Sequence, residues 1–392
     1  PERLADYGLD NPQTALEITL NDGKVIIIKL GSQIIDSKGY YGLVNDGNIV
    51  YQLPNSIGNV LKRSDVEFTD VEDTPDVESG NITYFKVALK NGTEYEFEKE
   101  TELFFNNAGN TFDSWKILKP YGETYTADGT KIQEQLEYYT NLNFLSCVDY
   151  KGEDLSKYGL DEPYATVHVD YYETRTETLE TPEKDPETGE EIKEKTVQEP
   201  REYTLFIGDK NEDGNYYVRL EGSKAVHVMD DEKIDNMINI KPFDLLHHFA
   251  LMPNISQVDW IEAEVNGTLY RMEITHKTEK DDEGEEKTIS TYYYNGREVE
   301  EKAFKKLYQT MISSQYDAEV SEEVNLEGKE PVLSLSFHLF GEGEGTYSAK
   351  FYRYNDSFDI IEKPDGKVFF ADKRDTDAIM NAISSFTGKT SE

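Results

Sequence analysis

The chain has 392 residues, and its 79 acidic and 40 basic side chains give a formal charge of −39 at pH 7. Such a charge repels nucleic-acid phosphates and anionic lipid headgroups, so neither is an expected partner. High net charge is also typical of disorder, but the 27 tyrosines and 18 phenylalanines bury large areas and allow several cores. We therefore expect an acidic, solvated surface over two or three small folded domains.

A short phrase near the amino terminus occurs a second time with the same internal spacing. The first copy is Leu4, Tyr7-Gly8-Leu9-Asp10 and Pro12, and the second is Leu155, Tyr158-Gly159-Leu160-Asp161 and Pro163. A self-match at a fixed distance indicates duplicated structural units.

The residues that follow each phrase predict four strands and a helix. In the first copy, Leu16, Ile18 and Leu20 alternate with polar residues, as in a strand with one buried face. Further strands are predicted at 24–30, around Tyr40-Tyr41 and at 49–51, with a helix at 55–61. The second copy repeats this order, with strands at 167–171, 203–207, 216–217 and 225–227 and a helix at 231–238.

A third, degenerate copy is predicted at the carboxyl end. Leu335, Phe337 and Leu339 follow Pro331 at the offsets seen in the first two copies, although the Tyr-Gly-Leu phrase is missing. Strands at 347–354, 358–361 and 368–370 and a helix at 375–383 complete it. We expect Leu16, Val167 and Leu335 to occupy equivalent sheet positions.

Two similar units connect the three copies. Each has an apolar strand, at 82–89 or 258–265, followed by Asn91-Gly92-Thr93 or Asn266-Gly267-Thr268. Asn-Gly between alternating runs is a strong hairpin signal, because a type I′ turn needs positive φ at both central residues. A helix capped by Asp128 and a second helix at 298–314 end the units.

The sequence thus predicts an α+β fold of repeated antiparallel β-meander modules, each covered by a short helix and joined by two related β-hairpin/helix units. The predicted boundaries are module 1 at 1–79, a linker unit at 80–149, module 2 at 150–253, a second linker unit at 254–323 and module 3 at 324–392.

The repeated phrase, the strand after it, the glycine after the second strand and the tyrosine pair resemble the bacterial domain-of-unknown-function family 4340. The resemblance implies an extracytoplasmic protein behind a single N-terminal membrane anchor, often encoded beside ABC-transporter components. It implies no catalytic residues. No run of the sequence approaches the roughly 20 apolar residues that span a bilayer. Because the sequence starts at Pro1, we expect any anchor to lie in a segment absent from it.

Few residues suggest a chemical site. Asp209, Asn211, Asp213 and Gly214 match the start of a calcium loop, but its twelfth position is Leu220 where a glutamate should close the shell. We expect a polar hairpin turn there, and whether the turn binds calcium stays open.

The histidines and the single cysteine have similarly ordinary interpretations. His168 and His338 are predicted on the polar faces of equivalent strands, and His247-His248 at a packed helix edge. Cys147 lies in an apolar run and is expected to be a buried thiol. We therefore predict no catalytic residue, no cofactor-binding residue, no metal ligand and no required cofactor.

An insertion at 173–201 interrupts module 2, and a smaller one lies around 281–284. Both predict polar hairpin arms, which are either solvated loops or partner-docking arms. We expect a non-enzymatic, membrane-tethered accessory protein that serves an ABC-type transporter or envelope assembly, with an envelope protein as partner. The alternative is an envelope glycan-binding module or carbohydrate-active enzyme that uses exposed tyrosines and a pair of carboxylates.

Overall fold

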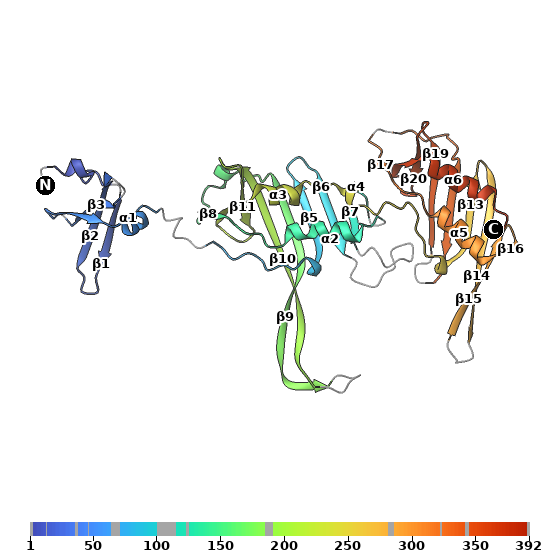
Figure 1. The fold of residues 1–392 in the computed structure, drawn as a ribbon, viewed down its shortest axis with the longest axis horizontal. Helices are drawn as coiled ribbons and strands as arrows, with labels where there is room; N and C mark the ends of the chain where they lie inside the picture. Colours follow the sequence, from blue (N-terminus) through green and yellow to red (C-terminus); the bar gives the residue numbers. More distant parts are fainter. Residues whose placement is uncertain are drawn as a thin grey trace.

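The structure is a computed structural model that describes residues 3–12, 14–35, 38–45, 47–63, 71–99, 115–122, 125–184, 191–280, 286–321, 324–341 and 345–389. These residues form an α+β fold of three antiparallel sheets with six short α-helices (Figure 1). None of the described helices is both long and apolar enough to cross a membrane.

The first sheet contains four strands in the order in which they occur in the chain. They are β1 (Thr14–Thr19), β2 (Val25–Gln33), β3 (Tyr40–Val44) and β4 (Val50–Leu53). Helix α1 (Asn55–Leu61) follows, and its Gly58 lies so close to Tyr40 that a Cβ would be 2.0 Å from the ring. The glycine therefore allows the helix to lie directly on the sheet.

The second sheet has eight strands, in the spatial order β7, β6, β5, β9, β10, β11, β12, β8. In chain order these strands are β5 (Ile82–Leu89), β6 (Glu94–Lys99), β7 (Trp115–Lys119), β8 (Ser146–Asp149), β9 (Ala165–Lys184), β10 (Glu191–Lys210), β11 (Tyr216–Leu220) and β12 (Val226–Met229). Helices α2 (Gly129–Leu136) and α3 (Asp231–Ile238) lie across one face of this sheet (Figure 1).

The third sheet has nine strands, in the spatial order β16, β15, β14, β13, β18, β19, β20, β21, β17. In chain order these strands are β13 (Val258–Val265), β14 (Thr268–Lys280), β15 (Glu286–Tyr294), β16 (Arg297–Glu298), β17 (Ala318–Glu319), β18 (Leu333–Leu339), β19 (Gly345–Arg353), β20 (Phe358–Glu362) and β21 (Val368–Asp372). Helices α5 (Glu301–Met311) and α6 (Lys373–Ser384) lie across one face.

The connecting units differ from the expectation that they join separate modules. Strand β5 pairs with β9, and β13 pairs with β18, so each hairpin unit extends the sheet that follows it in the chain. Strands β5 and β13 alternate apolar and polar residues in the same way as β9 and β18. Each can therefore pair with that strand and bury its apolar side chains on the same face. Helix α5 is shorter than the helix predicted at 298–314, because Arg297–Glu298 pairs with β15 as a strand.

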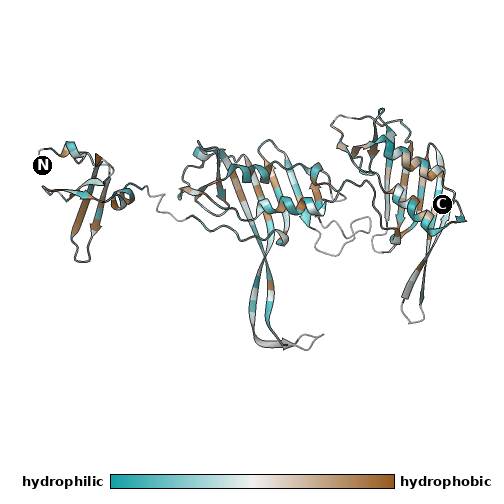
Figure 2. Cartoon of the chain, viewed as in Figure 1, coloured by the Kyte–Doolittle hydropathy of each residue, from teal (hydrophilic) through white to brown (hydrophobic). Residues whose placement is uncertain are grey.

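The core follows the period-two pattern of the strands. In β18, buried residues alternate with partly buried ones along the whole strand. Figure 2 shows the same alternation of apolar and polar residues along the strands of the second and third sheets. One face of each of these sheets is thus apolar beneath its helices, and the other is polar.

The repeated phrase forms a 3₁₀ turn that closes onto its own sheet. The two turns are Leu4–Tyr7 and Leu155–Tyr158, and each ends at a glycine with positive φ, 68° at Gly8 and 66° at Gly159. The next residue, Leu9 or Leu160, is buried. The phrase therefore forms a structural clip on its own sheet.

The tyrosine pair and the glycine after the second strand belong to the same clip. The Tyr7 and Tyr41 rings lie 4.8 Å apart, and those of Tyr158 and Tyr217 lie 5.0 Å apart, both edge to face. A Cβ on Gly208 would lie 2.0 Å from the carbonyl oxygen of Tyr158. Glycine is needed there because the turn crosses the strand at backbone contact.

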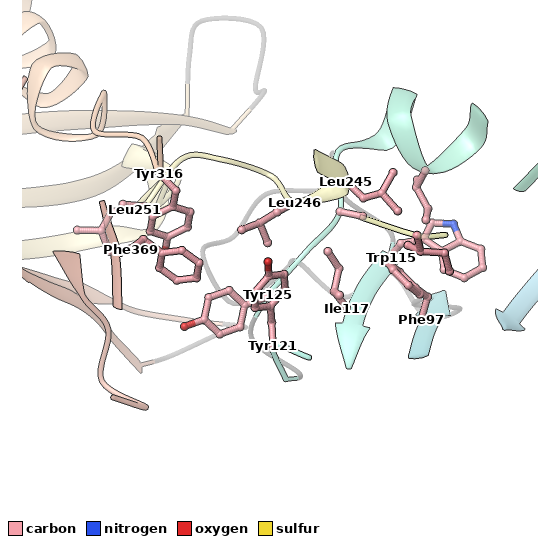
Figure 3. Close-up of a cluster of buried hydrophobic side chains, with 14 of the residues drawn as sticks. Phe97, Trp115, Ile117, Tyr121, Tyr125, Leu245, Leu246, Leu251, Tyr316 and Phe369 are labelled. Carbon is pink, nitrogen blue, oxygen red and sulfur yellow. The ribbon is translucent and has the colours of Figure 1, made fainter. Parts of the chain in front are cut away.

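Aromatic side chains join the second and third sheets. Tyr121 and Tyr125 follow β7, and their rings each lie 5.9 Å from Phe369 of β21 (Figure 3). Tyr316 stacks on Phe369 at 4.1 Å, and the ring of Phe243 lies 6.3 Å from it. These five residues form what we call the joint.

Hydrogen bonds across the joint fix its geometry. The Tyr121 hydroxyl donates to Glu319 at 2.5 Å, and the Tyr125 hydroxyl donates to Asp365 at 3.1 Å. Lys363 Nζ donates to the carbonyl of Ala250 at 2.8 Å. Buried aromatic area combined with satisfied polar groups makes the two sheets one packed body.

We predict that Lys363→Met changes the pH dependence of stability. Burial lowers the pKa of Lys363 to about 8, from an ordinary value of 10.5. Between these values the unfolded chain binds a proton that the folded chain lacks, so this lysine makes stability rise with pH. The free energy of unfolding of the variant minus that of the parent should therefore be highest below pH 8 and fall towards pH 10, whatever the loss of the hydrogen bond to Ala250 costs. Urea titrations of both proteins measure this difference, and a difference that rises with pH contradicts the prediction.

Candidate functional site

The calcium-like segment is a hairpin turn between β10 and β11. Asn211 Oδ1 accepts hydrogen bonds from the backbone N–H of Asp213 and Asn215, both at 3.0 Å. Asp209 lies instead against Gly159, where a Cβ would be 2.5 Å from its carboxyl carbon. The turn geometry agrees with the predicted polar hairpin, and calcium binding stays untested.

The expectation that His247-His248 lies at a helix edge is wrong. Helix α4 (Pro242–Leu245) ends before them, and Leu246 forms a β-bridge with Ala127. His247 N–H donates to the Thr126 carbonyl at 2.9 Å, which holds this segment extended between the second and third sheets. Backbone pairing with a distant segment overrides the apolar pattern here.

The other singled-out residues lie where the sequence places them. Cys147 is buried on β8, and burial raises the pKa of its thiol. Tyr40 and Tyr216 are buried, while Tyr41 and Tyr217 pack on the phrase tyrosines. These tyrosine pairs are used in packing, with Tyr41 and Tyr217 half-buried.

A cluster that sequence analysis did not assemble lies on the polar face of the second sheet. His168 and Asp170 of β9 lie beside Glu202 of β10, with their candidate ligand atoms within 4.8 Å of one another. Asp170 and Glu202 are directly opposite in the strand register. We call these three residues the His168 cluster.

The imidazole of the His168 cluster already has polar partners on both nitrogens. Its Nε2 lies 2.9 Å from Asp170 Oδ1, and its Nδ1 lies 3.0 Å from Thr204 Oγ1. A histidine with two carboxylates could hold a divalent cation. Glu202 is exposed, however, and both ring nitrogens are engaged, so the cluster is also an ordinary polar cross-strand network.

Tyr84 of β5 borders the cluster, with its ring 6.1 Å from that of His168. Its hydroxyl donates to Glu96 at 2.9 Å. Burial, together with the Glu96 carboxylate, raises the pKa of Tyr84 well above its ordinary value. The phenol thus stays protonated at neutral pH and acts as a hydrogen-bond donor.

An open hollow of about 450 Å³ adjoins the His168 cluster. Its lining residues come from β5, β9 and β10 and are Thr83, Asp170, Tyr171, Tyr172, Pro200, Arg201 and Glu202. Asp170 and Glu202 project side by side from adjacent strands and do not face each other across a cleft.

The hollow lies at the base of a long two-stranded arm. Strands β9 and β10 continue as a pair beyond the sheet, which Figure 1 shows projecting away from it. The predicted turn at 185–189 lies outside the described residues, as does the turn of the smaller arm at 281–284. The described residues of both arms are antiparallel strands, as the sequence predicts, with a register shift in the long arm between Ile192 and Glu194.

Ion pairs hold the described part of the long arm. Arg175 pairs with Glu177 at 2.8 Å and across the arm with Glu199 at 2.6 Å, and Arg201 pairs with Glu173 at 2.7 Å. Isolated two-stranded hairpins are marginal in water. Cross-strand ion pairs add a modest stabilisation to a polar arm that lies away from any core.

The described residues thus form an α+β protein of antiparallel sheets. Helices cover one face of the second and third sheets, and a polar arm projects from the second sheet. Comparison with protein families places the chain more narrowly. The chain belongs to the family described as Domain of unknown function (DUF4340), which it matches over residues 1–105 and 115–326. Comparison with curated proteins and with solved structures gave no match.

Proposed function

We propose that this protein is a non-enzymatic, extracytoplasmic accessory protein, tethered to the membrane, that binds an envelope protein such as a component of an ABC-type transporter. The observation that carries the proposal is the long arm. Its described residues bury no core of their own, yet cross-strand ion pairs connect its strands. An arm of this kind contributes little to stability, so a binding role accounts for its structure better.

The body beneath the arm supports this proposal. The joint packs the second and third sheets together, so the arm projects from a firm base. At that base, Asn81 Nδ2 donates to Thr174 Oγ1 at 3.2 Å, which braces the arm against the turn before β5. A braced arm loses little conformational entropy when a partner binds it.

The repeated architecture is the second part of the proposal. We propose that β1–β4, β9–β12 and β18–β21, each followed by a helix, are three copies of one meander module. Each set is consecutive in the chain and adjacent in its sheet. Repeated modules build extended surfaces for binding, and they do not by themselves build an enclosed catalytic cleft.

The alternative, a glycan-binding module or carbohydrate-active enzyme, has one observation in its favour. The hollow at the arm base carries Tyr172 beside Asp170 and Glu202. We retain this alternative as an outcome of the test below.

We predict that shortening the long arm abolishes partner capture and leaves the fold intact. Because Glu173 and Glu199 are directly opposite, residues 174–198 can be replaced by Asn-Gly to close a two-residue hairpin. The melting temperature should change little. In pull-downs from native envelope, proteins captured by the whole chain should be lost.

The smaller arm provides a matched control. Lys277 and Ile289 are opposite in β14 and β15, so replacing residues 278–288 by Asn-Gly makes an equivalent shortening. This variant should keep its captured proteins. Equal capture by both shortened variants and the parent, or recovery of glycan fragments with measurable turnover, contradicts the proposed function.

A further inference from the structure

The His168 cluster brings three side chains of metal-ligating type together on two central strands of the second sheet. His168 and Asp170 lie two residues apart on β9 and therefore share a face, and Glu202 of β10 lies directly opposite Asp170. Their candidate ligand atoms lie within 4.8 Å of one another. In the described part of the chain, no other group of three such side chains lies this close together.

The two carboxylates of the cluster lie side by side although like charges on opposite strand positions repel each other. The basic side chains nearest to them pair elsewhere. Lys86 lies opposite His168 on β5 but pairs with Glu94 at 2.7 Å. Arg201, next to the cluster in the chain, pairs with Glu173 at 2.7 Å. A cation bound between the two carboxylates of the cluster would relieve their repulsion.

Thr204 holds the imidazole of the cluster in the orientation that a metal ligand needs. It lies opposite His168 in the strand register, and its Oγ1 is 3.0 Å from His168 Nδ1. When this hydroxyl oxygen accepts from Nδ1–H, Nε2 is left as an acceptor 2.9 Å from the carboxylate oxygen of Asp170. Two acceptors at this distance need a proton or a cation between them. Histidines that bind metal ions ordinarily use their other ring nitrogen in this way.

The separations in the cluster fit a single ion. Zn²⁺ lies about 2.0–2.2 Å from imidazole nitrogen and carboxylate oxygen, so two neighbouring ligand atoms are roughly 3 Å apart. The 2.9 Å between His168 Nε2 and Asp170 Oδ1 agrees with this value. Glu202 is exposed and can turn its carboxylate into a third position. The open hollow of about 450 Å³ beside Asp170 and Glu202 gives access to the ion and space for water as a further ligand.

We infer that the His168 cluster is a binding site for a divalent transition-metal ion such as Zn²⁺. The ligands are His168 Nε2 and one carboxylate oxygen each from Asp170 and Glu202, with water in the remaining position. A set that includes imidazole favours such an ion over Ca²⁺ and Mg²⁺, which take oxygen ligands. The ion joins β9 to β10 at the base of the long arm. The inference stands independently of what the arm binds.

Calorimetric titration of the whole chain with zinc chloride, after treatment with a chelator, tests the site. Glu202→Gln removes one ligand, so the affinity should fall at least about tenfold, since loss of a group that merely supports a ligand costs about 10–100-fold. Glu202 is exposed, so the variant should melt like the parent when zinc is absent.

The matched control is His338→Gln. His338 of β18 also has its Nδ1 3.0 Å from a threonine hydroxyl, that of Thr346, but its ring stacks on Trp260. Among the described residues it belongs to no cluster of three candidate ligands. The control should therefore bind zinc like the parent.

Nitrogen NMR of the imidazoles shows whether the ion binds at His168 or elsewhere on an acidic surface. Zinc should shift the Nε2 resonance of His168, assigned by its loss in His168→Gln, and should leave that of His338 in place. Equal affinity of the parent and Glu202→Gln overturns the inference. So does a parent that binds no zinc, or a His168 resonance that stays unmoved at saturation, and either result makes the cluster a polar cross-strand network alone.

Discussion

Replacing Phe369 by alanine should cost about 3–5 kcal/mol of unfolding free energy, because a large ring is removed from a packed site that cannot close around the gap. Phe369 is buried, and its ring contacts rings of residues from both sides of the joint. We therefore expect more than a loss of stability. The second and third sheets should stop unfolding together.

Urea unfolding followed by hydrogen exchange measures this coupling. In the parent, β5–β12 and β13–β21 should lose protection in one transition, and in Phe369→Ala they should separate into two. The matched control is Phe370→Ala in the same strand, whose ring lies against Tyr354 and Phe358 and outside the joint. A single transition in Phe369→Ala, or equal uncoupling in the control, contradicts the account of the joint.

Gly208→Ala should cost about 2–3 kcal/mol, because the added methyl group overpacks a backbone contact. The Cβ would lie 2.0 Å from the Tyr158 carbonyl and 3.0 Å from the Leu160 side chain. Neither partner can move without displacing the 3₁₀ turn. The expected result is loss of the clip that carries the repeated phrase.

Thermal unfolding of Gly208→Ala and of a control glycine variant tests the clip. Gly80 has nothing within 4 Å of its Cβ position, so Gly80→Ala should leave stability nearly unchanged. If the two variants melt alike, the phrase is not the structural clip described here, and its repetition needs another explanation.

Locally encoded features were predictable from the sequence. The predicted helices at 55–61 and 231–238 coincide with α1 and α3, and Asp230 caps α3 by accepting from Lys233 N–H. Asp128 caps α2 as expected, with Oδ1 accepting from Thr130 N–H at 3.0 Å. The buried and half-buried members of each tyrosine pair also follow from strand alternation.

Long-range features were not predictable. The pairing of β5 with β9 and the joint around Phe369 bring together segments far apart in the chain, and no local pattern specifies them. The His168 cluster shows the same limit. Alternation places His168 and Asp170 on one face, but finding Glu202 opposite Asp170 requires the register of β10, which the inserted arm obscures.

We propose that this protein holds a partner protein through its long arm. Photo-crosslinking in cells that produce the protein tests it most directly, with the photoreactive residue at Thr176 of the long arm or, as a control, at Thr278 of the smaller arm. Both threonines are exposed and lie opposite another threonine. We predict a discrete protein adduct from position 176 and none from position 278. Adducts with glycan alone, or no adduct from position 176, would contradict the claim.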